Sequence, residues 1–146
     1  MTFEWTCEED FLGGLLLKTD DKADRKLLEM LAETTVSVRT QPRTGLVMMS
    51  VTDATGEDFH LGEVLVTEAE AEFEGHAGYA AILGNQPGKA LIRAALSAIL
   101  ESDNIARKTA FCEFLAREAE KIRETENQAE ALVASTTVHF EKMTQW

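Results

Sequence analysis

Residues 44–84 constrain the fold most, because three extended segments follow one another there with short Gly-bearing turns between them. The middle segment alternates, with one side lined by Val64, Val66, Glu68, Glu70 and Glu72 and the other by Leu65, Thr67, Ala69, Ala71 and Phe73. Successive side chains of a strand point to opposite faces, so this strand has one apolar and one acidic face. Residues 53–56 and 74–77 are polar connections typical of antiparallel hairpins. The segment is therefore predicted to be a β-meander.

The rest of the chain adds one more strand and several helices. Strands are expected over residues 36–40, 45–52, 58–73 and 78–83, with a turn at residues 41–44. Helices are expected from Asp20 or Asp21 to about Glu33, over residues 87–100, and from Asp103 or Asn104 to about Val133. Residues 1–18 give only a short helical pattern, 8–18, interrupted by two glycines. We predict a single domain over residues 1–146 of the α+β class: a four-stranded, mainly antiparallel meander sheet with helices on one face and a long C-terminal helix.

The helix over residues 87–100 is apolar on more than one side. Ile92, Leu96 and Ile99 lie off the stripe formed by its alanines. A helix that is apolar nearly all round is buried on two sides. One side should pack on the sheet, and the other should be covered by the long helix, by a second copy of the chain or by a partner subunit. The three side chains are therefore candidate interface residues. The long helix is mostly polar between Arg117 and Glu130, which indicates that this part projects.

Charge and cysteine content exclude several classes of protein. The formal net charge of -12 disfavours binding to nucleic acid and disfavours a site in which this chain alone holds a triphosphate. No apolar run has the length of a membrane span, and the run at residues 11–17 follows acidic residues, unlike a secretory signal. A cytoplasmic protein is expected. Cys7 and Cys112 are far apart, so no zinc or iron–sulfur site is expected. Cys112 is interpreted as a small core residue, and a disulfide between the two cysteines is the alternative, disfavoured in a reducing compartment.

Few polar residues are candidates for chemistry. His60 and Glu63 are three residues apart, which places them on opposite faces of a strand unless a bulge near Gly62 changes their relation. A hydrogen-bonded or partly exposed side chain is the ordinary role of each histidine. His60, Glu63 and Arg39 are the candidates for substrate binding, and no catalytic residue or metal ligand is proposed.

Two further patterns have a plain and a functional interpretation. Residues 84–90 resemble a phosphate loop, but the glycine spacing is one residue short and Ala90 stands where Ser or Thr would hold magnesium. A simple strand-to-helix turn is favoured. The glutamates at 68, 70, 72 and 74 are interpreted as an exposed sheet face, or as a docking strip for a basic partner. No serine triad order, nucleophile elbow or dinucleotide fingerprint is present, and this profile is typical of an assembly subunit.

An ordered set of segments carries a family resemblance. The segments are residues 44–48 (TGLVM), 59–69 (FHLGEVLVTEA), 75–79 (GHAGY) and 83–84 (LG), followed by the alanines of the next helix and by residues 136–143 (TTVHFEKM). Together they resemble the G subunit of bacterial carbon–phosphorus lyase, the PhnG family. Glu141 departs from the pattern, since the family more often has two adjacent aromatics there. The resemblance covers most of the chain from about Leu27 onward and is strongest over the meander.

The resemblance implies a role in the catabolism of organic phosphonates. In that family's pathway the G, H, I and J subunits form a core complex, and the I subunit, supported by G and H, displaces adenine from ATP with an alkylphosphonate. The product is α-D-ribose 1-alkylphosphonate 5-triphosphate. The J subunit then cleaves the carbon–phosphorus bond with an iron–sulfur cluster and S-adenosylmethionine.

For this chain the resemblance implies a structural or accessory subunit of the ribose 1-methylphosphonate 5-triphosphate synthase and carbon–phosphorus lyase complex. The isolated chain is expected to be inactive and to hold no cofactor. Its expected partners are the H, I and J subunits, with self-association when it is alone. His139 and Phe140 in the C-terminal tail join Ile92, Leu96 and Ile99 as interface candidates. Two alternatives stay open: a stand-alone small-molecule enzyme with a pocket near His60 and Glu63, and a homodimeric binding protein.

Overall fold

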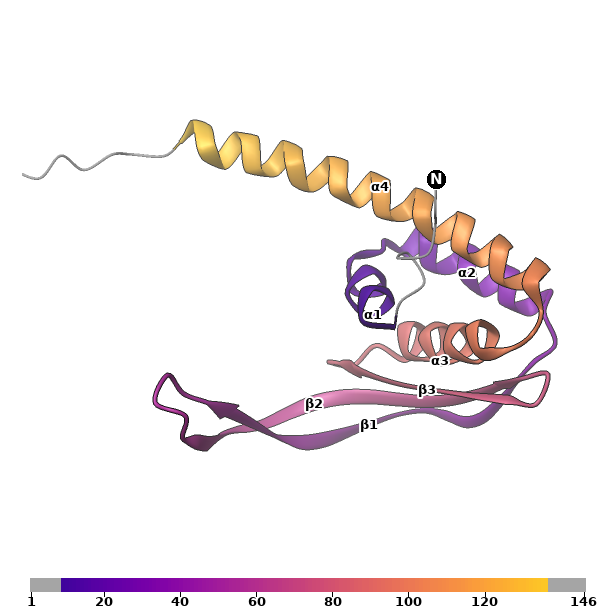
Figure 1. Ribbon diagram of the computed structural model, residues 1–146, viewed down its shortest axis with the longest axis horizontal. Coiled ribbons are helices and arrows are strands. Elements are labelled where there is room, and N and C mark those ends of the chain that lie inside the picture. Colours follow the sequence, from indigo (N-terminus) through magenta and orange to yellow (C-terminus); the bar gives the residue numbers. More distant parts are fainter. Residues whose placement is uncertain (1–8, 137–146) are drawn as a thin grey trace, which may run out of the picture.

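The computed structural model describes residues 9–136, with side chains from residue 14 onward. The elements in chain order are α1 (Glu9–Lys18), α2 (Asp21–Ala32), β1 (Val36–Thr52), β2 (Asp58–Phe73), β3 (His76–Leu83), α3 (Pro87–Glu101) and α4 (Ile105–Ser135). The helices lie on one face of the sheet, with α3 against the strands and α4 on the far side of α3 (Figure 1). The α+β class, the antiparallel sheet and the long C-terminal helix are therefore confirmed.

The sheet has three strands in the order β1-β2-β3, so the prediction of four strands is wrong. The predicted strands 36–40 and 45–52 are one strand, β1, which continues through Pro42. The pairing of β1 with β2 shifts its register between Val38 and Thr40 and again between Thr40 and Arg43, and these shifts let the strand continue past Pro42. Proline is tolerated because β1 is an edge strand, where a missing backbone donor breaks no ladder on the outer side.

The predicted alternation of β2 is confirmed. Thr67, Ala69, Ala71 and Phe73 are buried against the helices, while the glutamates between them lie on the opposite face. The turn to β3 is made by Glu74 and Gly75, whose φ angles of 49° and 85° fit a two-residue hairpin turn of type I′. β3 therefore begins at His76, two residues before the predicted start.

Small residues bring α3 very close to the sheet. Ala94 and Ala98 of α3 face Gly78 of β3, and a Cβ atom added at Gly78 would lie 2.1 Å from the carbonyl oxygen of Ala94 and 2.4 Å from the amide nitrogen of Ala98. Gly78 therefore allows backbone to pack on backbone. The opposite side of α3 is covered within the same chain, since Ile92, Leu96 and Ile99 are fully buried and belong to one core with residues of α1, α2 and α4.

The helix ends follow the sequence signals. The carboxylate of Asp20 accepts a hydrogen bond from the amide of Ala23 at 2.7 Å, and Asn104 caps α4 by accepting from the amide of Arg107 at 3.1 Å. α4 is anchored by its buried Phe111 and Leu115, and residues 123–135 are exposed, as predicted for a projecting helix (Figure 1). Cys112 is half-buried and disulfide-bonded, so its interpretation as a small core residue is wrong and the disulfide alternative fits better. Cys7 lies outside the described residues.

Beyond the end of β3, the strands β1 and β2 continue together as a two-stranded ribbon. Leu83, the last residue of β3, pairs with Val66, and Gly45 is opposite Val66 on the other side. We call residues 45–66 the arm. Figure 1 shows that it extends past β3 and away from the helices. None of its residues is buried.

Candidate functional site

The acidic row on β2 is matched by side chains of β1. Arg39 forms an ion pair with Glu72, Thr40 donates its hydroxyl to Glu70 at 2.7 Å, and the Nε of Arg43 lies 2.6 Å from the Oε1 of Glu68. Three glutamates of β2 thus have polar partners on the neighbouring strand β1, so they do not form a docking strip of free carboxylates.

Tyr79 on β3 joins this network from the other side. Its hydroxyl donates to the Oε2 of Glu68 at 3.0 Å. Hydrogen bonds from Arg43 and then Tyr79 hold the pKa of the Glu68 carboxyl below its usual 4.5. The same contact with the Glu68 carboxylate raises the pKa of the Tyr79 phenol above its usual 10.0, because the phenol would lose its acceptor partner on ionising. A small open depression beside it is lined by Arg39, Glu70, Ala77, Gly78 and Tyr79.

The three candidates for substrate binding do not converge. The Nδ1 of His60 lies 2.8 Å from the hydroxyl oxygen of Ser50. A register shift between Met49 and Ser50 and the φ of 142° at Gly62 place a bulge between His60 and Glu63. Arg39, however, is about ten residues away from Ser50 along β1, which is roughly 30 Å at the rise of an extended strand. The pocket required by the stand-alone enzyme alternative is not assembled from these side chains.

The segment that resembles a phosphate loop has a different role. The Nζ of Lys89 donates to the carbonyl oxygens of Leu16 at 2.7 Å and Thr19 at 2.8 Å, and lies 3.5 Å from a carboxylate oxygen of Asp24. Lys89 therefore closes the C-terminal end of α1 instead of facing a ligand. Its positive charge lies where the last carbonyl groups of the helix lack partners within the helix, which is favourable for the helix dipole. Sequence reasoning missed this role, and it missed Thr67.

Thr67 fixes the turn between β3 and α3. Its hydroxyl, fully buried, donates to the carbonyl oxygen of Gly84 at 2.6 Å and accepts from the amide of Gln86 at 3.0 Å. A threonine at an inward position of an otherwise apolar strand face was the sequence signal that could have indicated a buried hydrogen bond.

The interface candidates fall into two groups. Ile92, Leu96 and Ile99 have no exposed surface in this chain, so a surface for a partner has to be sought elsewhere. His139 and Phe140 lie outside the described residues. Among the described residues no group of three His, Cys, Asp or Glu side chains is placed to hold a metal ion, and none of the described helices is long and apolar enough to cross a membrane.

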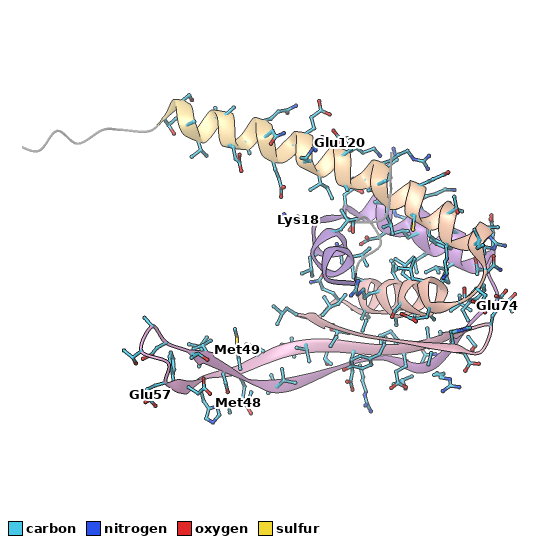
Figure 2. All side chains as sticks on the ribbon, in the orientation of Figure 1. Lys18, Met48, Met49, Glu57, Glu74 and Glu120 are labelled. Carbon is cyan, nitrogen blue, oxygen red and sulfur yellow. The ribbon has the colours of Figure 1, made fainter. Side chains whose placement is uncertain are left out.

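The arm carries the largest group of exposed apolar side chains among the described residues. Leu46, Val47, Met48, Met49, Phe59, Leu61 and Leu65 are all exposed. Met48 and Met49, being neighbours on a strand, point to opposite sides of the ribbon, and Figure 2 labels both on the part that lies away from the helices. The largest uncovered apolar feature among the described residues is therefore a surface and not a pocket.

Comparison with known proteins gave one family. A family model described as "Phosphonate metabolism protein PhnG" matches residues 12–145. A comparison with curated proteins found no match.

Proposed function

This chain belongs to the PhnG family of phosphonate metabolism proteins, and we propose that it serves there as a non-catalytic subunit. Its role is to support the I subunit of the carbon–phosphorus lyase core complex alongside the H subunit, with the J subunit as a further partner, in the cytoplasm. The reaction supported is the displacement of adenine from ATP by an alkylphosphonate, which gives α-D-ribose 1-alkylphosphonate 5-triphosphate.

One observation carries the non-catalytic role: the cationic side chains Arg39, Arg43 and Lys89, which could hold a triphosphate, are engaged in ion pairs and hydrogen bonds within the chain. Arg39 and Arg43 form ion pairs with Glu72 and Glu68, Lys89 closes α1, and His60 lies roughly 30 Å along the strands from Arg39. A site for a triphosphate needs several cations or backbone amides directed at one place, and such a cluster is not formed by these residues.

The acidic balance favours the same role. A chain with a net charge of -12 repels ATP and phosphonate over most of its surface, whereas it attracts a partner with a basic contact face. The homodimer alternative has no comparable support, because two copies of an acidic surface repel each other.

Co-expression tests the proposal. The chain with an affinity tag should retain the H, I and J subunits of the complex through a size-exclusion column, and the tagged chain alone should release no adenine from ATP and methylphosphonate. Retention of none of the three subunits, or adenine release by the isolated chain that is lost in His60→Ala, would contradict it.

A further inference from the structure

The arm is apolar on both of its faces. One face carries Leu46, Met48 and Leu65, and the other carries Val47, Met49, Val64 and Val66. Leu46 is 61% exposed and Leu61 is 60% exposed, so these side chains are left in water by this chain. A sheet that has one face in water normally alternates apolar and polar residues, whereas strands apolar on both sides are buried on both sides.

The arm also has no support from a third strand. β3 ends opposite Val66, where the amide of Gly84 donates to the carbonyl oxygen of Leu65 at 2.8 Å. Beyond that point neither edge of the ribbon pairs with another of the described strands. A two-stranded ribbon is marginally stable in water, and long apolar edges invite pairing with other chains. The geometry is that of an element enclosed by something else.

The tip of the arm is nevertheless well ordered by its own hydrogen bonds. The carboxylate of Asp53 accepts from the amide and hydroxyl of Thr55 at 2.8 and 2.6 Å, and from the amide of Glu57 at 3.1 Å. Thr52 donates to Asp58 at 2.5 Å across the two strands. The arm is thus preformed, which lowers the ordering cost of a contact.

The charges of the arm identify the kind of occupant. No lysine or arginine occurs between Thr44 and Gly88, and the arm carries Asp53, Glu57, Asp58 and Glu63. Among the described residues, none of these four carboxylates forms an ion pair. A second copy of the arm would bring like charges together, and a membrane surface or a nucleic acid is itself anionic. The complementary surface is apolar with a rim of lysine and arginine side chains.

We propose that the arm is the element by which this chain inserts into a partner subunit, in an apolar groove rimmed by basic side chains. The inference rests on the proposed function and adds the surface responsible. About twenty residues, with apolar side chains on both faces and acidic ones gathered mainly at the tip, match the size of one side of a specific interface.

Paired serine variants test the apolar contact. In the tagged chain co-expressed with the H, I and J subunits, Leu46→Ser with Leu61→Ser removes two exposed arm side chains. Retention of the subunit that holds the arm should fall by roughly tenfold or more, as for central residues of an interface. The control, Ile105→Ser with Leu132→Ser, changes two side chains of α4 that are 77% and 69% exposed and should leave retention unchanged. Both variants should melt at the wild-type temperature, since no altered side chain is buried.

Charge reversal tests the rim. Glu57→Lys with Glu63→Lys should weaken retention of the same subunit, whereas Glu124→Lys with Glu130→Lys on the projecting part of α4 should not. The subunit lost from both arm variants is the one that holds the arm.

The outcomes separate the two claims. Equal retention by wild type, both arm variants and the controls would overturn the arm as the contact and leave the proposed function standing. Loss in the α4 controls and not in the arm variants would overturn it in favour of α4. If the isolated wild type is a dimer that Leu46→Ser with Leu61→Ser dissociates, while retention is unchanged, the occupant is a second copy and the inference is wrong. A wild type that retains no subunit would overturn both claims.

Discussion

Gly78→Ala is expected to destabilise this protein strongly, because α3 packs on the backbone of β3 at that position. The added Cβ would lie 2.1 Å from the carbonyl oxygen of Ala94 and 2.4 Å from the amide nitrogen of Ala98. Both atoms belong to the helix backbone, so no side chain can rotate to make room. The φ angle of Gly78 is not in the left-handed region, so the effect is one of space alone.

The magnitude follows from the contact distances. Ordinary contact needs 3.4–4 Å, so α3 would have to move away from the sheet by roughly 1 Å or more. That movement loosens Ala94, Ala98 and the sheet residues beneath them. Overpacking in a close-packed core costs about 1–3 kcal/mol, and we expect about 3 kcal/mol here because the clash is with backbone. With a slope of about 2 kcal/mol per molar urea, the midpoint of unfolding should fall by roughly 1.5 M.

Urea unfolding followed by circular dichroism at the helix band measures the effect. The matched control is Gly14→Ala in α1, where a Cβ meets nothing within 4 Å. This change should stabilise the chain by roughly 0.5–1 kcal/mol, because alanine is the better helix former. A midpoint for Gly78→Ala within roughly 0.3 M of the wild type would refute the close packing of α3 on β3.

Two further changes test one polar contact on the sheet and one between α3 and the end of α1. Tyr79 is the only tyrosine of the chain, so the absorbance of tyrosinate reports its pKa directly, and the titration midpoint should lie above pH 10.0. Glu68→Ala should move this midpoint back toward 10.0, and an unchanged midpoint would exclude the hydrogen bond between Tyr79 and Glu68. Since the phenol pKa is raised in the folded state, this contact stabilises the fold below pH 10 and is lost as the pH rises through the folded-state pKa. Lys89→Met should lower the free energy of unfolding by urea by about 2–4 kcal/mol, because two carbonyl oxygens and Asp24 lose a largely buried partner. The control, Lys22→Met at an exposed position, should lower it by less than about 0.5 kcal/mol. Equal costs for the two variants would contradict the role of Lys89 in closing α1.

The elements that sequence predicted well are those with a strong local signal. The alternation in β2 specifies its two faces, and Asp20 and Asn104 specify where α2 and α4 begin. The strand count was wrong because of Pro42: local sequence rules assign a turn to a proline, so one strand was predicted as two. In the structure an edge strand with a shifted register accommodates this proline. Whether proline interrupts a strand depends on which edge faces solvent, and that is a tertiary property.

The candidate site was less predictable. The apolar sides of α3 suggested an assembly surface, but three helices of the same chain cover them, and helix-to-helix packing cannot be deduced from the period of one helix. The surface that does remain uncovered, the arm, was seen in the sequence as ordinary meander strands. Its length beyond β3 became visible only when the register placed Val66 opposite Leu83. The role of Lys89 was hidden for the same reason, because its partners are about 70 residues away in the sequence.

The central claim is that this chain supports the I subunit without contributing catalytic groups of its own. The most direct test is adenine release from ATP and methylphosphonate by the purified I and H subunits, titrated with this chain. The rate should rise with added chain and saturate at a fixed ratio to the I subunit, and Arg39→Ala, His60→Ala and Glu63→Ala should saturate at the same maximal rate as the wild type. A maximal rate that falls a hundredfold or so in any of these variants, with saturation at the same ratio, would place a catalytic group on this chain and contradict the account.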